Sequence, residues 1–503
     1  MTMHTVRELI ARAAARTPDA VYAVSTESGA ALSYRALQAG CRQIARQLDA
    51  HGVPRGAVVS LVMPNGLATL QLLLGCLWAG RCVNPVNLLA TGEPMRYVLA
   101  HSDCALVFAA PEWAARVREI VATLPRRVPV VSVEPDAVPA IDDAPAAHDP
   151  PPPKPEDLAL LMYTSGTTGL PKGVMLTQAN LAANAQSISA EHGLTAADRV
   201  LAVLPLYHIN AFAVTMLAPL VAGGSLAMPP RFSAARFWAQ ASEHACSWLN
   251  VVPTMISYLL EADAPPREER ARIRFCRSAS AALPPEHLRG FEAKFGIGVV
   301  ETMGLTETVA PSFSNPMDAA QRKLGSVGRA SGGEACVLDA GTLQPVPDGS
   351  TGELAIRGPH VMRGYYKNPE ATAAAFTPDG WLRTGDLGHR DADGFFFVTG
   401  RLKELIIKGG ENIAPREIDE ALLQHPAVLE AAVVGIADRH YGQEIMACIV
   451  RREGVACSED ELRDFCAAKL GRYKTPKIFR FVTELPRGPS GKVQRLKLAG
   501  LAG

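Results

Sequence analysis

Hydrophobic positions between residues 30 and 145 alternate between two spacings. Residues 33–52 and 67–78 place apolar side chains at the helical period, whereas residues 57–63 and 105–109 are short apolar runs of strand length. Strands that are apolar throughout, separated by helices, are typical of a parallel sheet covered on both faces. This pattern predicts an α/β fold for the first part of the chain.

The same alternation resumes after residue 200 and continues to the C-terminus. A charged segment near residue 401 separates the last aromatic strand from a further set of elements, and such a segment suits a boundary between domains. That set comprises predicted helices at 415–423 and 459–470 and strands near 432–435 and 446–450. We therefore expect a large N-terminal multi-subdomain α/β domain (1–400), a hinge (401–403) and a small C-terminal α/β domain (404–503).

Composition and charge narrow the function classes. Lys+Arg and Asp+Glu are both 50 among 503 residues, so no basic excess indicates nucleic acid or an anionic membrane as a partner. The ten cysteines include no C-x-x-C pair, which argues against a zinc site and a disulfide framework and favours the cytoplasm. The most apolar stretches are too short or too interrupted to predict a transmembrane segment. The sequence leaves the oligomeric state open, and a homo-oligomer is compatible with it.

The strongest candidate for chemistry follows the apolar run 158–162. Hydroxyl groups, glycines and a lysine are concentrated there, at Thr164, Ser165, Gly166, Thr167, Thr168, Gly169 and Lys172. Glycines let backbone N–H groups approach phosphate oxygens, hydroxyls add donors, and the lysine adds positive charge. The spacing is not that of a Walker A loop. A loop that binds a nucleotide triphosphate is the first hypothesis, and a surface linker is the alternative.

Each of several polar residues downstream is compatible with a structural role and with a functional role. His208 follows a strand and could be a hydrogen-bonded structural residue, while Glu307 in G-L-T-E could hold Mg²⁺ beside phosphates or lie in a solvated loop. Asp386 lies between glycines and could form a turn or bind ribose hydroxyls, and Lys492 in a Pro/Gly segment could be merely solvated. Residue types alone leave these alternatives open.

The segment Y-T-S-G-T-T-G-L-P-K-G at 163–173 closely resembles the phosphate-binding signature of the acyl-adenylate-forming (AMP-binding) superfamily, specifically its acyl-CoA ligase branch. Further segments resemble family motifs in the family order: P-L-Y-H (205–208), S-A-S-A-A-L (278–283), M-G-L-T-E (303–307), T-G-D-L-G (384–388) and P-S-G-K (489–492). The resemblance covers about residues 30 to 497. Met303, Ala279 and Ala282 depart from the usual Tyr, Gly and Pro, which predicts altered adenine stacking and pocket shape.

The resemblance implies a role for each matched residue. Nucleotide binding falls to Thr164, Ser165, Gly166, Thr167, Thr168, Gly169, Lys172, Ser280, Met303, Gly304, Thr306, Asp386, Arg401 and Lys492, and the metal ligand is Glu307. The implied catalytic residues are Lys492, Lys172, Thr164, Glu307 and His208. Lys403 would be the pivot of a mobile C-terminal domain, and Gly409 and Gly410 would line the tunnel for the thiol.

The implied activity is that of an ATP-dependent carboxylic acid–CoA ligase, with ATP, Mg²⁺ and coenzyme A. The acid and ATP form acyl-AMP and pyrophosphate, and coenzyme A then displaces AMP. Lys492 would stabilise negative charge as the carboxylate attacks the α-phosphorus, and no general base is needed because the carboxylate is already ionised. An amino-acid adenylation domain is disfavoured because residues 209–213 contain no aspartate. A stand-alone enzyme that loads a carrier protein and a catalytically dead nucleotide-binding homologue are the alternatives.

The acid pocket is expected to be mainly small and apolar, formed by His208, Asn210, Phe212, Val251, Ser280 and Ala310. No arginine stands among these residues to pair a second carboxylate. The sequence therefore predicts a fatty or aromatic monocarboxylic acid rather than a diacid, with Asn210 available to a polar group.

Overall fold

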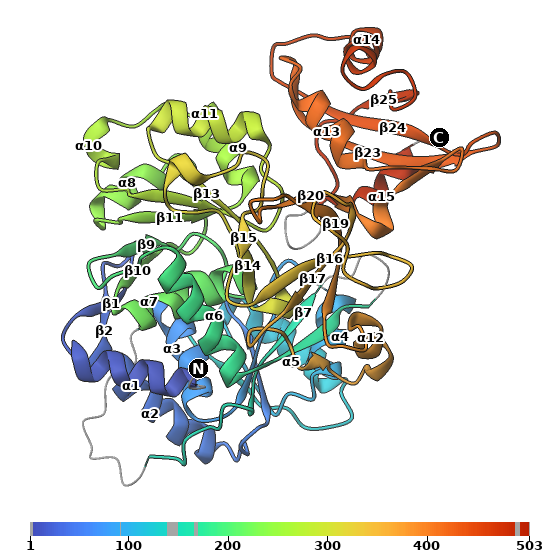
Figure 1. The fold of residues 1–503 in the computed structure, drawn as a ribbon. Coiled ribbons are helices and arrows are strands. Elements are labelled where there is room, and N and C mark those ends of the chain that lie inside the picture. The colour runs from blue at the N-terminus through green and yellow to red at the C-terminus, as the bar shows by residue number, and fades with distance from the viewer. Residues whose placement is uncertain (1–3, 91, 138–148, 165–169, 488–492, 502–503) are drawn as a thin grey trace.

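The computed structural model describes the chain except residues 1–3, 91, 138–148, 165–169, 488–492 and 502–503. Three sheets form the large N-terminal part, and a fourth forms a smaller part that stands above it in Figure 1. This mixed α/β architecture confirms the predicted fold class. No helix in the described ranges is long and apolar enough to cross a membrane.

The largest sheet has nine strands and carries most of the candidate acid pocket. Its order is β15 (Arg329–Ala330), β14 (Ala310–Ser314), β13 (Val299–Leu305), β12 (Phe275–Ser278), β11 (Trp248–Val251), β9 (Arg199–Leu201), β10 (Ser225–Met228), β1 (Val21–Ser25) and β2 (Ala31–Ser33). From β13 to β1 all neighbours are parallel, as the apolar strand pattern predicts, whereas β14, β15 and β2 pair antiparallel.

The second sheet carries the phosphate segment. Its order is β18 (Gly364–Tyr365), β8 (Lys172–Thr177), β7 (Leu158–Thr164), β4 (Cys82–Pro85), β3 (Val58–Val62), β5 (Leu106–Ala109) and β6 (Val130–Ser132). The third sheet is β16 (Glu334–Leu338), β17 (Gly352–Arg357), β19 (Leu382–Arg390) and β20 (Phe396–Arg401).

Helices cover the sheets of the N-terminal part and connect the parallel strands. They are α1 (Val6–Arg16), α2 (Tyr34–Ala50), α3 (Leu67–Trp78), α4 (Glu93–His101), α5 (Pro111–Ala122), α6 (Gln178–Glu191), the π-helix η1 (Asn210–Leu217), α7 (Ala218–Ala222), α8 (Phe237–Glu243), α9 (Pro253–Glu261), α10 (Arg267–Arg270), α11 (Pro285–Phe295) and α12 (Pro369–Ala375), with short 3₁₀ turns η2 (Thr306–Thr308), η3 (Ala319–Gln321) and η4 (Leu402–Glu404).

The C-terminal sheet has the order β22 (Glu411–Ile413), β21 (Ile406–Lys408), β24 (Gly442–Arg451) and β23 (Val428–Asp438), with β25 (Ile478–Phe481) beside β24. Its helices are α13 (Pro415–Leu423), α14 (Glu459–Leu470), α15 (Arg495–Leu498) and the 3₁₀ turn η5 (Ala499–Leu501). Two hydrophobic clusters pack on this sheet, and their members all lie between residues 406 and 499.

Several predicted elements match the structure closely, because their boundaries are written in local sequence. The predicted helices 67–78, 415–423 and 459–470 are α3, α13 and α14. Helix α2 begins one residue later than predicted, since the Ser33 hydroxyl accepts the Ala36 N–H at 3.1 Å and caps the helix.

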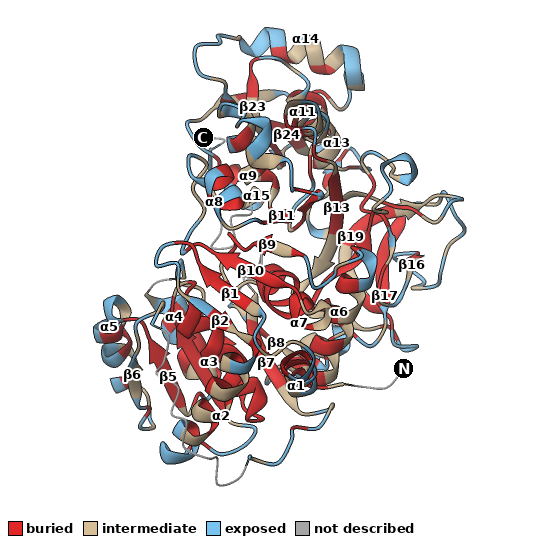
Figure 2. Ribbon diagram, turned by 90° about the vertical axis from the view of Figure 1, so that its left-hand side faces the viewer, coloured by how far each residue is buried: buried red, intermediate tan, exposed pale blue. Residues whose placement is uncertain are grey.

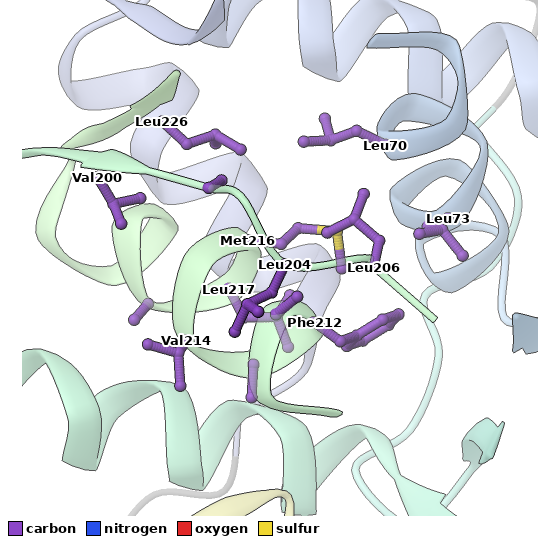
Figure 3. Close-up of a cluster of buried hydrophobic side chains, with 14 of the residues drawn as sticks. Leu70, Leu73, Val200, Leu204, Leu206, Phe212, Val214, Met216, Leu217 and Leu226 are labelled. Atoms are coloured by element: carbon purple, nitrogen blue, oxygen red, sulfur yellow. The ribbon is translucent and has the colours of Figure 1, made fainter. Parts of the chain in front are cut away.

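The main core lies where η1 meets the two large sheets. Every residue of α3 and of η1 is buried, as expected for helices that are apolar on all sides, and α3 is labelled in Figure 2, where buried residues are red. Leu70 and Leu73 of α3 and Phe212 and Met216 of η1 belong to the apolar cluster shown in Figure 3. The segment that follows the candidate His208 is therefore held by the core itself.

Candidate active site

The phosphate segment is the connection of a β-hairpin. Thr164 ends β7 and Lys172 begins β8, and the two residues are antiparallel partners. The expectation of a loop running to residue 173 was therefore wrong at its end, because Lys172 and Gly173 pair with β7 as strand residues. Residues 165–169, with the predicted Ser165, Gly166, Thr167, Thr168 and Gly169, lie outside the described residues.

Tyr365 connects the two charged groups predicted for phosphate and metal. The Lys172 ammonium lies 4.8 Å from the centre of the Tyr365 ring, and the Tyr365 hydroxyl donates to Glu307 Oε1 at 2.8 Å. Strand β18 places Tyr365 there by pairing with Val174 of β8. Burial, followed by the Glu307 carboxylate, raises the pKa of Tyr365, so the hydroxyl remains a donor at neutral pH.

Glu307, the predicted metal ligand, is a single carboxylate that contacts Tyr365. It lies half-buried in η2, and its backbone carbonyl accepts the Met362 N–H at 2.7 Å. The described residues contain no group of three or more His, Cys, Asp or Glu side chains that could hold a metal ion by itself. One carboxylate suits Mg²⁺ that takes the rest of its shell from phosphate and water. The residues present therefore fit a magnesium–nucleotide complex rather than a protein-only metal site.

The backbone around the predicted adenine segment is unusual. Ser280, Val309 and Ala310 have positive φ values of 76°, 57° and 77°, and such conformations cost about 1–3 kcal/mol each for residues other than glycine. A Cβ at Gly304 would lie 1.7 Å from the carbonyl oxygen of Ala310, so only glycine fits there. This close approach holds β13 and β14 tightly together at Gly304 and Ala310.

Met303, Thr306 and Ser280 are all half-buried near this backbone. The side chain of Met303 packs against the cluster that contains Phe313 and Phe396. The side chain of Met303 therefore contacts this apolar cluster, and its place beside adenine stays a prediction.

The predicted ribose residue forms an ion pair with a second predicted nucleotide residue. Asp386 Oδ1 accepts from Arg401 Nε at 2.7 Å, and Asp386 is nearly buried. The sequence left a turn or a ribose site open for Asp386, and the family resemblance implied the ribose role. In the structure Asp386 lies within β19 opposite Arg401 of β20, beside a register shift between β17 and β19. The pKa of Arg401 is raised chiefly by Asp386, and Glu307 contributes to the same shift. Asp386, Arg401 and Glu307 are thus within electrostatic reach of one another.

The predicted acid-pocket residues fall into two groups. Asn210, at the start of η1, donates from Nδ2 to Ser280 Oγ at 3.1 Å, and half-buried His208 precedes it with its ring 4.7 Å from that of Tyr207. Phe212, Val251 and Ala310 are buried members of the main core. The structure therefore joins Asn210 and Ser280 directly by a hydrogen bond and places Phe212, Val251 and Ala310 in the hydrophobic core.

Sequence reasoning missed one residue that contacts this group. The six predicted pocket residues contain no arginine, but Arg277 donates to one of them, Asn210. Arg277 on β12 donates from Nη1 to Asn210 Oδ1 at 2.7 Å and to Asn250 Oδ1 at 2.8 Å. It is 1% exposed. A charged residue within the apolar strand F-C-R-S was the available signal, because arginine is rarely buried without a reason. For Tyr365 the sequence offered only the segment G-Y-Y at 364–366, which by itself indicates no role.

The predicted hinge and tunnel residues lie at the start of the C-terminal part. Lys403 is exposed in η4. Gly409 and Gly410 have φ values of 57° and 89° and form the two-residue turn between β21 and β22, a turn type that favours glycine. Lys492, the predicted catalytic lysine, lies outside the described residues.

Comparison with known proteins identifies the family to which this chain belongs. Residues 10–366 match the family model of the AMP-binding enzyme, and residues 417–492 match the AMP-binding enzyme C-terminal domain. The chain therefore belongs to the AMP-binding enzyme family.

Individual relatives cover almost the whole chain. A sulfoacetate–CoA ligase of Cupriavidus necator is 58% identical over 98% of this chain and 97% of its own length, and an oxalate–CoA ligase of Arabidopsis thaliana is 36% identical over 90% of each. The solved structure of ATP-bound MatB from Rhodopseudomonas palustris superposes with a TM-score of 0.91 at 31% identity, covering 99% of both chains.

These matches confirm the predicted enzyme class. The protein is an AMP-forming acid–CoA ligase that uses a carboxylic acid, ATP, Mg²⁺ and coenzyme A. A related o-succinylbenzoate CoA synthetase from Bacillus subtilis, 29% identical and with a TM-score of 0.84 over 97% of this chain and 98% of its own, was solved with ATP and a magnesium ion. The single carboxylate of Glu307 suits that chemistry.

Proposed function

We propose that this ligase activates a short carboxylic acid with a second anionic group, of which sulfoacetate is the leading candidate. The observation that carries the proposal is 58% identity to a sulfoacetate–CoA ligase along nearly the full length of both chains. The oxalate–CoA ligase among the relatives also acts on a small acid with two acidic groups. The expectation of a fatty or aromatic acid depended on the absence of arginine from the six predicted pocket residues, and the contact of Arg277 with one of them, Asn210, weakens that argument.

In the first half-reaction, a carboxylate oxygen attacks the α-phosphorus of ATP and pyrophosphate leaves. We assign phosphate binding to Thr164, Lys172 and residues 165–169, with Thr306 alongside, and metal binding to Glu307. The contact of Tyr365 with both Lys172 and Glu307 supports this assignment, since it keeps a positive and a negative group at fixed positions beside each other. His208 would orient the acid.

The other nucleotide contacts are assigned to residues on neighbouring segments. Asp386 and Arg401 would bind the ribose, while Ser280, Met303 and Gly304 would border the adenine. Lys492 would place positive charge where negative charge develops in the transition state. The ion pair of Asp386 and Arg401 supports the first of these roles, because it fixes the carboxylate in one orientation.

In the second half-reaction, the sulfur of coenzyme A attacks the acyl carbon and AMP leaves. We infer that the C-terminal domain (404–503) turns about residues 401–403 between the two steps, relative to the domain formed by residues 1–400. Separate hydrophobic clusters on the two sides of this segment support the boundary. Gly409 and Gly410 would then border the path of the thiol.

The cysteines support a reducing compartment for the protein, which agrees with the predicted cytoplasmic location. All ten cysteines are free thiols and eight of them are buried.

The first test measures pyrophosphate release with ATP and Mg²⁺ across sulfoacetate, oxalate, malonate, fatty acids, benzoates and cinnamates, with and without coenzyme A. We expect release with sulfoacetate and a thioester only when coenzyme A is present. A preference for long-chain or aromatic acids would overturn the proposed substrate. Adenylate formation without thioester formation from coenzyme A would indicate a carrier protein as acceptor. No pyrophosphate release with any acid would indicate a catalytically inactive homologue.

The second test concerns Lys492. Lys492→Ala should abolish pyrophosphate release while ATP binding, measured by calorimetry, persists. The control Lys497→Ala changes an exposed lysine on α15 and should leave turnover unchanged. Unchanged turnover in Lys492→Ala would refute the catalytic assignment.

A further inference from the structure

Arg277 is a fully buried arginine inside the nine-stranded sheet. It faces Asn250, its register partner on the parallel strand β11, and both lie beneath the start of η1, where Asn210 completes the cluster. Asn210 and Asn250 are also buried, and Asn250 Nδ2 donates to Asn210 Oδ1 at 3.3 Å. We call Arg277, Asn210 and Asn250 the arginine cluster.

The charge of Arg277 is not neutralised by the described protein groups around it. Its Nη1 atom donates to two amide oxygens, its Nε atom is buried without a hydrogen-bond partner, and it forms no ion pair with any carboxylate of the described ranges. The titratable group facing it from α6 is His192, whose pKa burial, and secondarily Arg277, lowers to about 3. His192 is therefore neutral and adds no negative charge.

Arg277 nevertheless remains protonated at neutral pH, because burial lowers its pKa only to about 9. A buried cation without an anion is strongly unfavourable, whereas the same cation with an anion and satisfied hydrogen bonds is not. The buried positive charge of Arg277 is therefore compensated only when an anion lies beside it.

The cluster is connected to the candidate acid pocket. Asn210 Nδ2 donates to Ser280 Oγ, and Ser280 is half-buried with a φ of 76°. His208 lies two residues before Asn210 and is the residue assigned to the reacting carboxylate. The side chain of Asn210 thus links the segment that carries His208 to both Ser280 and Arg277.

We propose that the arginine cluster is the subsite that binds the second anionic group of the acid, a sulfonate or carboxylate. The guanidinium supplies charge and a planar array of donors, and the two asparagine amides can reorient to donate to the remaining oxygens. This inference rests on the proposed function and names the residues that set its specificity. It explains why two asparagines rather than carboxylates face the arginine, since a carboxylate would occupy the place of the substrate.

The test compares sulfoacetate with methylsulfonylacetate, which has a similar shape but no charge at its distal end. We expect the wild-type enzyme to favour sulfoacetate in kcat/KM, and Arg277→Met to lower kcat/KM for sulfoacetate by about 100-fold or more. The same variant should change kcat/KM for methylsulfonylacetate and KM for ATP by only a few-fold.

Asn250→Asp provides a second variant that preserves side-chain volume. Its carboxylate would pair with Arg277 and should also reduce use of sulfoacetate, even where Arg277→Met fails to fold. Arg274→Met is the control, because it removes a positive charge from the same segment but belongs to a pair with Asp198 at 2.6 Å outside the cluster.

The outcomes separate this inference from the proposed function. Equal losses for both acids, or an unchanged preference for sulfoacetate in both variants, would show a structural role for Arg277 and overturn the inference alone. A wild-type enzyme that uses no acid with a second anionic group would overturn the proposed substrate itself.

Discussion

At the scale of single residues, Tyr365 determines how Lys172 and Glu307 are presented. Its ring lies beneath the ammonium of Lys172 and its hydroxyl donates to Glu307, so one side chain restrains both charged groups. A hydrogen bond to a charged group contributes about 1.5–3 kcal/mol when it is buried. The residue is thus expected to position the phosphate and metal groups without itself reacting.

Tyr365→Phe tests this role, since it retains the ring and removes the hydroxyl. We expect kcat/KM for ATP to fall by about 10- to 100-fold, with a higher Mg²⁺ concentration needed for half-maximal rate, because Glu307 loses its donor. Pyrophosphate release over a magnesium titration measures both effects.

Tyr366→Phe is the matched control for this prediction. The Tyr366 hydroxyl donates to Asp103 instead, away from Glu307. Equal effects of the two variants would contradict a specific role for Tyr365.

At the scale of elements, β13 joins two segments of the site through a buried carboxylate. Glu301 lies in β13, is 3% exposed, and accepts the Leu283 N–H at 3.1 Å, which holds the segment after β12. Burial raises its pKa from 4.5 to about 7, although the hydrogen bond from Leu283 and the charge of Arg416 oppose the shift. The folded protein therefore keeps a proton on Glu301 that the unfolded chain has lost.

This difference in protonation between the folded and unfolded states predicts how the free energy of unfolding depends on pH. Because the folded state binds more protons between pH 4.5 and 7, the stabilisation due to Glu301 is present below about pH 4.5 and is lost as pH rises through 7, by about 3 kcal/mol at most. Glu301→Gln keeps an acceptor for Leu283 and cannot ionise. Its Tm should equal that of the wild type near pH 4.5 and exceed it at pH 8.

Thermal unfolding followed by circular dichroism at several pH values measures this difference. Glu27→Gln is the control, because Glu27 is exposed in a pair with Arg236. A constant Tm difference between Glu301→Gln and wild type across the whole range would refute a titrating Glu301.

At the scale of the whole molecule, the segment between the domains is anchored on both sides. Arg401 is paired with Asp386 of the N-terminal part, while Glu404 accepts from Arg495 of α15 at 3.2 Å. Arg495 also pairs with Asp419 of α13 at 2.6 Å. Lys403 lies between these anchors and is exposed, so rotation of the domain is expected to concentrate there.

Lys403→Pro restricts φ at this position and should separate the two half-reactions. We expect acyl-AMP formation to continue near the wild-type rate and thioester formation to fall, because the second step needs the rotation. Rapid-quench measurement of each step distinguishes them. Lys403→Ala, which keeps backbone freedom, should support both steps, and equal loss of both steps in Lys403→Pro would contradict the hinge.

The elements and the order of the motifs followed from the sequence because they depend on neighbouring residues. The apolar run of α3, the Ser33 cap of α2 and the consecutive glycines at 409–410 each act within a few residues, and the signature at 163–173 identified the family. The chemistry of adenylation followed from the same contiguous motifs.

Contacts between distant segments were decided only by the tertiary structure. The glycines near Asp386 are a local signal that left a turn open as one alternative, whereas sheet pairing with β20 placed Asp386 in a strand beside Arg401. Asn210 and Arg277 are 67 residues apart, and the parallel register of β11 and β12 together with η1 brings them together. Local sequence determined the reaction, because the motifs that carry it are contiguous, whereas the position of the buried Arg277 beside Asn210 was decided by the fold.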